Sequence, residues 1–310
     1  MSRPVSLVAT TSVRLVLRER VVALLAALFV VLVMISAWLG WSATSTVNGI
    51  YVRAAAFLAA AGQPVPPNPV LDISPLSLMR NMVVYVALIG ALAAIVVGNR
   101  LMTLDRAGGV VPLLASRPMT RRQLAIAKIA ALAVVIAGLT GVAALVSIAA
   151  FAVLPATSLD LAGWLRLFGF FGISALYMML FGLLALGCAA LARSESVALL
   201  IPVTIWLTLT FILPSLTANI HPTAAINPIA ALAPAPDSTF FHWTGALLGP
   251  LSLGESYKVA SAGLLNFLPA THVTPVIPPV AGLLAAGVIA VFGAVAALVR
   301  MDRTKGEFDV

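Results

Sequence analysis

The residues best suited to metal or acid–base chemistry in this chain are three histidines, His221, His242 and His272. They stand about 20 and 30 residues apart, whereas metal-binding imidazoles on one helical face are spaced about three or four residues apart. The chain contains no H-E-x-x-H, G-x-S-x-G or G-x-x-x-x-G-K-[ST] motif. We therefore expect no catalytic residue, no metal site and no nucleotide-binding loop, with a copper or zinc site at the histidines as the alternative.

The composition excludes a soluble enzyme. Among 310 residues, 62% are hydrophobic and 9% are charged, and the mean hydropathy is +1.11. A soluble domain carries about 25% charged residues because its surface must be solvated. The one cysteine, Cys188, excludes a disulfide within the chain. The composition predicts a polytopic membrane protein, with residues 1–310 forming a single transmembrane domain.

Six apolar segments are long enough to cross a bilayer core of about 30 Å as helices, so the predicted fold is an all-α integral membrane bundle. We place them at about 21–43, 81–99, 129–154, 168–192, 196–220 and 279–299. The basic, amphipathic segment 3–20 before the first span is predicted to form an elbow helix along the inner membrane interface.

The connections between the spans differ in length and character. The external loop 44–80 is predicted to contain one short helix, Ile50–Ala61, before its proline-rich centre. The external segment 221–278 contains apolar stretches at 240–253 and 259–268 that are too short to span and are candidates for interfacial or re-entrant helices. The remaining long connection is the loop 100–128.

Lysine and arginine set the predicted orientation. With both termini in the cytoplasm, fourteen of the 18 basic side chains lie inside, and only Arg53, Arg80, Arg166 and Lys258 lie outside. This asymmetry is the one that the positive-inside rule describes. The net charge of +8 therefore does not indicate nucleic-acid binding.

The predicted spans carry no ionisable residue near their centres. Ion-coupled transporters usually keep such a residue there, because the coupling ion must bind to a side chain. Among the milder polar residues, Tyr177, Thr204 and Thr208 are candidates for lining a substrate pathway, although hydrogen bonding between helices explains them more simply. A transport protein of this kind would take its energy from a partner.

The loop 100–128 is the best candidate surface for that partner. Gly108 and Gly109 are expected to break the helix that leaves the membrane, and Leu113 and Leu114 form a short apolar face. Proline after Arg117 favours a turn at that residue. We expect Thr120 to cap a helix that returns to the membrane with Arg121, Arg122 and Lys128.

This stretch resembles the signature of the ABC-2 type permeases. The matching residues are Asp105, Gly109, Leu113, Leu114, Ser116, Arg117, Pro118, Thr120, Arg121 and Lys128. Within that family, the pattern is most similar to the branch of the permease for nitrous-oxide-reductase maturation. The plan of an elbow helix, six spans and a long external segment before the last span is also similar, and implies a type V exporter-like permease fold.

The resemblance implies how such a chain would work. Two permease chains, identical or related, would form the pathway, and two separate ATP-binding subunits, carrying ATP and Mg²⁺, would dock below them. The residues implied to couple the two proteins are Asp105, Gly109, Leu113, Leu114, Arg117, Pro118, Thr120, Arg121 and Arg122. It further implies export across a prokaryotic inner membrane, with no enzymatic activity on this chain.

Three other functions are compatible with the sequence. A membrane scaffold or assembly factor for a periplasmic or membrane enzyme would also lack ionisable groups in its spans. A lipid-modifying membrane enzyme would need acidic residues that converge at one membrane face, yet Asp72, Asp160, Asp237 and Glu255 are scattered singly. Secondary transport is the third. The substrate does not follow from the sequence.

Overall fold

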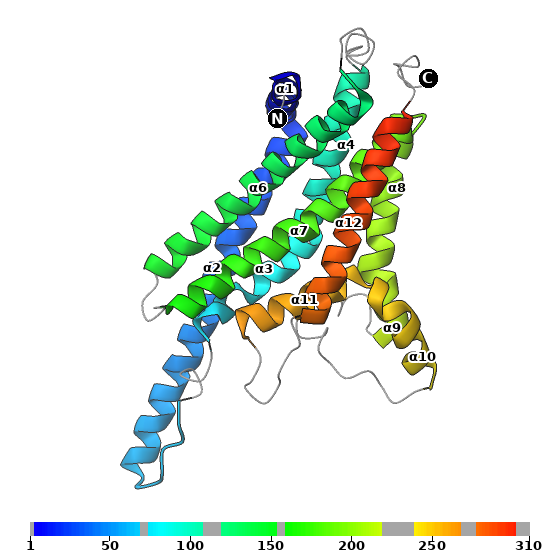
Figure 1. Cartoon of the computed structure of the whole chain (residues 1–310). Helices are drawn as coiled ribbons and strands as arrows, with labels where there is room; N and C mark the ends of the chain where they lie inside the picture. The colour runs from blue at the N-terminus through cyan, green and yellow to red at the C-terminus, as the bar shows by residue number, and fades with distance from the viewer. Residues whose placement is uncertain are drawn as a thin grey trace.

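The computed structural model describes residues 3–68, 74–107, 119–153, 159–218, 239–267 and 277–301. Within these ranges the regular structure is helical and no β-strand occurs. Six helices or helix runs are long and apolar enough to cross a membrane, which confirms the predicted all-α bundle with six spans (Figure 1). They are α2 (Arg20–Ala60), the run Pro75–Arg106, α6 (Arg121–Val153), α7 (Leu161–Leu191), the run Glu195–Thr217 and α12 (Ile277–Arg300).

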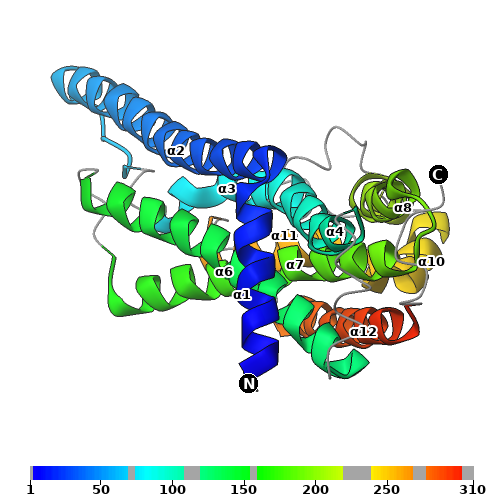
Figure 2. The ribbon, with the colours of Figure 1, turned by 90° about the horizontal axis from the view of Figure 1, so that it is seen from above.

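The amphipathic segment at the N-terminus forms a separate helix, α1 (Arg3–Arg18), as the sequence predicts. Extended backbone at Glu19 separates it from α2. Its buried residues recur every three or four positions, so one face packs against the bundle, mainly on α6 and α4. Viewed from above, α1 lies across the end of the bundle (Figure 2).

The first span is longer than the sequence analysis expects. Instead of ending near residue 43 and restarting as a short helix, α2 runs for 41 residues, or about 60 Å. No proline lies within residues 20–60, the next proline is Pro64, and alanine is frequent in the last two turns, so no residue stops the helix once it has left the bundle. It ends just before Gly62, whose φ of 66° is left-handed, and its outer part projects beyond the other helices (Figure 1).

Two of the spans contain a π-helical turn. The second consists of η1 (Pro75–Met79), α3 (Arg80–Tyr85), the π-turn η2 (Val86–Gly90) and α4 (Ala91–Ala107). The fifth consists of α8 (Glu195–Leu207), the π-turn η3 (Thr208–Ile212) and α9 (Leu213–Ala218). The indole Nε1 of Trp206 donates a 3.3 Å hydrogen bond to the carbonyl oxygen of Ala87 in η2, which connects the two spans.

The helix α7 is central and packs against α4, α6, α8, α11 and α12. Its approach to α4 is closest where Gly98 faces Gly182, and a Cβ atom on Gly98 would overlap the carbonyl oxygen of Gly182. Glycine is therefore needed at this crossing because the two backbones touch.

At the end of the bundle opposite α1 lie α10 (Thr239–Leu248), η6 (Gly249–Leu251) and α11 (Leu253–Leu265). These elements are too short to span a membrane, as expected for residues 240–253 and 259–268. In Figure 1, α11 runs across the lower end of α7 and α12 rather than alongside them.

Candidate functional site

The candidate site is the end of the bundle where α1, the last turns of α4 and α7 and the first turns of α6 and α8 meet; we call it the basic end (Figure 1). The predicted coupling residues Gly109, Leu113, Leu114, Arg117 and Pro118 lie in residues 108–118, outside the described residues. The residues on either side of that segment are described, and they show how it is anchored.

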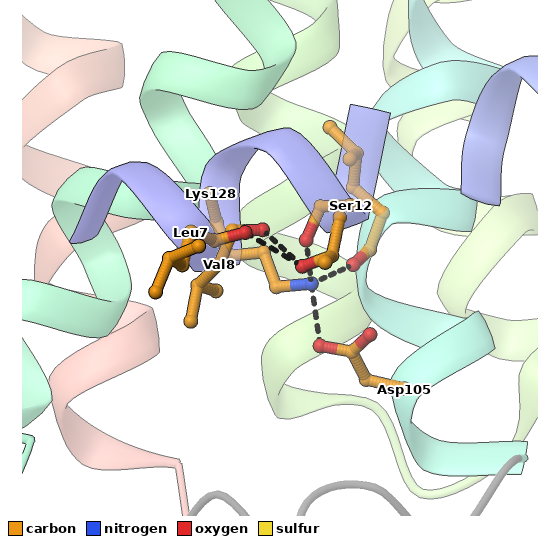
Figure 3. A network of polar contacts seen from close by, with 7 residues as sticks. Leu7, Val8, Ser12, Asp105 and Lys128 are labelled. Atoms are coloured by element: carbon orange, nitrogen blue, oxygen red, sulfur yellow. Dashed lines mark hydrogen bonds and ion pairs between the residues drawn. The ribbon is translucent and has the colours of Figure 1, made fainter. Parts of the chain in front are cut away.

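Lys128 is the central side chain of the basic end. It lies in the second turn of α6 and is fully buried. Its Nζ forms an ion pair with the carboxylate of Asp105 in α4 and donates hydrogen bonds to Ser12 Oγ of α1, at 2.9 Å, and to the carbonyl oxygen of Leu101, at 2.7 Å (Figure 3). A buried ammonium requires such partners because desolvation is costly. This one side chain therefore connects α1, α4 and α6.

The structure gives Asp105 an internal contact. Its side chain is about 8% exposed and faces Lys128, so the carboxylate is directed into the protein. The neighbouring Arg106 is also buried, and its Nη1 donates to the carbonyl oxygens of Ala189 at 2.9 Å and Ala192 at 2.8 Å. These carbonyls lie at the end of α7, where a helix lacks internal donors and its dipole favours a cation.

A second ion pair connects α4 to the fifth span. The Nη1 atom of Arg100 lies 2.7 Å from Oε1 of Glu195 in the first turn of α8. Both side chains are partly exposed, so the pair contributes little to stability and mainly restrains the position of the turn between α7 and α8. Ser194 caps α8 by accepting a hydrogen bond from the Val197 amide.

On the other side of residues 108–118, α6 begins as the sequence predicts. Thr120 Oγ1 accepts a hydrogen bond from the Gln123 amide at 3.2 Å, and the Gln123 side chain accepts one from the Thr120 amide at 2.9 Å. This reciprocal pair is a capping box. Arg121 is exposed and donates to the carbonyl oxygen of Val299 in the last turn of α12 at 2.8 Å, whereas Arg122 is exposed beside it.

The helices on either side of residues 108–118 are bonded to different parts of the bundle. Before it, α4 is bonded to α6 and α1 through Asp105 and Lys128, and to the end of α7 through Arg106. After it, α6 is bonded to α12 through Arg121. The two helices that flank residues 108–118 therefore contact α1, α7 and α12 as well as each other.

Sequence reasoning missed Ser12 and Arg106 as site residues. It placed Lys128 on the helix that returns to the membrane and in the family pattern, but not among the coupling residues. The signal that could have found the ion pair is the position of Asp105 and Lys128. They carry opposite charges and lie at the adjoining ends of two consecutive antiparallel spans. The partners of Arg106 are backbone carbonyls, which no residue pattern reveals.

The three candidate pathway residues do not form one surface. Tyr177 is fully buried in α7, where it stacks on Tyr257 of α11 with ring centroids 4.5 Å apart. Thr204 and Thr208 lie one turn apart on the exposed face of the fifth span, and Thr208 Oγ1 donates to the Thr204 carbonyl oxygen at 2.9 Å. Only the two threonines are therefore accessible from outside this chain.

At the end opposite the basic end, α11 carries a buried polar cluster. The hydroxyl groups of Tyr257 and Ser174 are 2.9 Å apart, and Lys258 is buried one residue further along α11. Burial raises the pKa of Glu255, and this shift is opposed by the charge of Lys258 and by the nearby hydroxyl groups of Ser252 and Thr217. Burial likewise lowers the pKa of Lys258, against the attraction of Glu255.

The Glu255 shift predicts a pH dependence. The folded chain binds the Glu255 proton more tightly than the unfolded chain, so this contribution to stability is complete below the ordinary pKa of 4.5 and is lost as pH rises through the folded-state pKa. We expect the unfolding temperature of Glu255→Gln in detergent to rise relative to that of wild type as the pH is raised above 4.5. Glu19→Gln, a half-buried carboxylate between α1 and α2, is the control, and parallel pH profiles for wild type and Glu255→Gln would contradict this expectation.

Comparison with known proteins agrees with this architecture. Residues 7–305 match the family described as ABC-2 family transporter protein. The chain belongs to the ABC-2 transporter family. A search of the curated proteins finds no significant match to this ABC-2 permease.

Family membership makes the chain a multi-pass membrane protein and the permease component of an ABC transporter. Permeases of this family associate with a separate ATP-binding subunit. The match extends from α1 through α12, so the elbow helix and the basic end are both part of the family region.

Proposed function

We propose that this permease moves its substrate out of a prokaryotic cell, across the inner membrane, driven by a separate ATPase that docks at the basic end. The observation that carries the proposal is that the helices on both sides of residues 108–118 are bonded to other helices, through the buried Asp105 and Arg106 before the segment and through the exposed Arg121 after it. An ATPase that binds and hydrolyses ATP with Mg²⁺ would press on this segment. Asp105, Arg106 and Arg121 would then pass the displacement to the bundle.

The distribution of charge supports the orientation in this proposal. The basic end holds most of the arginines among the described residues, and both the start of α1 and the end of α12 lie there (Figure 1). Under the positive-inside rule this end faces the cytoplasm, where the ATPase is. Both termini are then cytoplasmic, and the projecting part of α2 and the helix α11 lie outside.

Two permease chains would form the pathway between them, as identical or related subunits. The exposed Thr204 and Thr208 are available to line it, whereas Tyr177 would act from inside the protomer by holding α11. The motif from Asp105 to Lys128 supports grouping this permease, within the ABC-2 family, with the branch of the nitrous-oxide-reductase maturation permease. A substrate that is used in the assembly of a periplasmic enzyme would be consistent with membership of that branch.

The test is co-purification of the tagged permease from its native host in mild detergent, followed by mass spectrometry. We expect a stoichiometric phosphate-loop ATPase with the wild type, and its loss with Arg117→Glu combined with Arg121→Glu. Because Arg121 also bonds to α12, Arg117→Glu alone and an unfolding curve for each variant separate lost contact from misfolding. Arg53→Glu, an exposed arginine at the other end, is the matched control.

The proposal would be contradicted if the wild-type permease is purified without any ATPase in several detergents. That result would favour a membrane scaffold or assembly factor. Retention of the ATPase by the folded double variant would leave the complex intact but would disprove the assignment of Arg117 and Arg121 to coupling.

A further inference from the structure

The outward face of α1 combines arginines with exposed leucines. Arg14 and Arg18 are exposed and one turn apart, so they lie on the same line along the helix. Leu15 and Leu17 are 48% and 56% exposed. At 100° per residue these two leucines fall on opposite flanks of the arginine line. Leu7, 64% exposed, lies on that line two turns earlier.

The opposite face of α1 is fixed to the bundle. Val5, Ala9, Ser12 and Val16 follow one another at intervals of three or four residues and are all buried. The helix lies across the end of the bundle, at a large angle to the spans (Figure 2). With the spans crossing a bilayer, this orientation places α1 roughly parallel to the membrane plane, at the level where the spans end.

These features match the headgroup region of the inner leaflet. Arginines in the middle of the face are suited to anions, and leucines on both flanks are suited to apolar atoms on both sides of the helix, as in helices that lie in a membrane interface. A leaflet of anionic lipid supplies phosphate groups above and acyl carbons on either side. A protein docked from the cytoplasm would satisfy the arginines but would leave flanking leucines exposed to water.

The buried face of α1 leads to the coupling residues. Ser12 Oγ accepts a hydrogen bond from Lys128 Nζ, and the same ammonium forms the ion pair with Asp105 (Figure 3). The position of α1 therefore determines one of the three partners of Lys128. The exposed face of α1 is therefore connected, through Ser12 and Lys128, to the helices that flank residues 108–118.

We propose that α1 is a binding surface for anionic lipid headgroups, that Arg14 and Arg18 contact their phosphate groups, and that bound lipid regulates coupling through Ser12. The regulatory part rests on the proposed function, whereas lipid binding does not. Two experiments therefore test the two parts separately.

The first experiment measures binding of phosphatidylglycerol to the purified permease alone by native mass spectrometry. Each arginine near an anionic surface contributes about a fivefold change in the binding constant, so we expect Arg14→Gln with Arg18→Gln to weaken binding by about 25-fold. The matched control is Arg53→Gln with Arg166→Gln, two exposed arginines at the opposite end. Equal binding by the wild type and the α1 variant would overturn the proposed lipid surface.

The second experiment measures ATP hydrolysis by the permease–ATPase complex in nanodiscs of phosphatidylcholine, with or without phosphatidylglycerol. We expect phosphatidylglycerol to change the wild-type rate several-fold, and to have no effect on the α1 double variant. Ser12→Ala should still bind the lipid but should lose the change in rate.

Equal activity of the wild-type complex in both nanodiscs would overturn the regulatory part. The α1 double variant could instead fail to bind the ATPase subunit in both nanodiscs while it still binds phosphatidylglycerol. In that case the arginines contact an acidic protein surface, and the lipid proposal is wrong. If no ATPase partner exists, the proposed function and the regulatory part fail together, and the first experiment alone still decides lipid binding.

Discussion

Replacing Lys128 with methionine will destabilise the permease by about 3–5 kcal/mol, because it leaves the Asp105 carboxylate buried without a counter-charge. The same change removes the hydrogen bonds to Ser12 Oγ and to the Leu101 carbonyl oxygen, so α1 also loses its polar contact with the bundle. Thermal unfolding in mild detergent, followed by size-exclusion chromatography, measures the loss. We expect the surviving folded fraction to bind its ATPase but to couple poorly.

The control for this prediction is the double variant Lys128→Met with Asp105→Leu. Replacing both charges by apolar groups removes the unpaired carboxylate, so the double variant should be more stable than Lys128→Met alone. A double variant that is less stable by the sum of the two single effects would show that the ion pair has no special role. An unfolding temperature of Lys128→Met equal to that of wild type would contradict the buried pair itself.

Replacing Gly98 with alanine should have a comparably large effect. The added methyl group would overlap the Gly182 carbonyl oxygen, which is backbone and cannot rotate away, so α4 and α7 must separate. Overpacking of this kind typically costs about 1–3 kcal/mol and more where backbone must move. Because Arg106 in α4 bonds to the end of α7, the same separation would loosen the basic end.

The matched control is Gly138→Ala in α6, where a Cβ atom would meet no other atom within 4 Å. Alanine is favoured over glycine inside a helix by about 0.5–1 kcal/mol, so this variant should be slightly more stable than wild type. The two glycine-to-alanine substitutions are therefore expected to change the stability of the permease in opposite directions. A Gly98→Ala permease as stable as Gly138→Ala would refute the close crossing of α4 and α7.

Much of the fold could be predicted from local patterns. The six spans follow from hydropathy, and the start of α6 follows from a threonine placed three residues before Gln123. Hydropathy alone predicts a first helix that ends near residue 43, where the apolar segment is long enough to have crossed the membrane. Alanine-rich sequence continues a helix in water as well, and α2 continues to Ala60.

The site was less predictable because its contacts join helices that are far apart in the sequence. Asp105, Thr120, Arg121 and Arg122 were identified from the loop motif as one group. In the structure, Asp105 faces Lys128 and Thr120 caps a helix. Arg121 is hydrogen-bonded to α12. A motif identifies residues, but which of them face inward depends on how neighbouring helices pack.

The candidate pathway residues also depend on helix packing that the sequence does not reveal. Tyr177, Thr204 and Thr208 share mild polarity, which was the only property that the sequence could compare. Burial separates them, because α7 is the central helix of the bundle and the fifth span is at its surface. Tyr177 consequently packs on Tyr257, whereas the threonines remain exposed.

The most direct test of the account is site-specific cross-linking of the permease to its ATPase in native membranes. In a Cys188→Ala background, a single cysteine replaces either the exposed Arg122 at the basic end or the exposed Arg53 at the other end. With a short bifunctional reagent, we predict that Arg122→Cys cross-links to a phosphate-loop ATPase, with a yield that changes when ATP is added, and that Arg53→Cys does not. An intact complex that cross-links through Arg53→Cys, or in which Arg122→Cys never reaches the ATPase, would contradict coupling at the basic end.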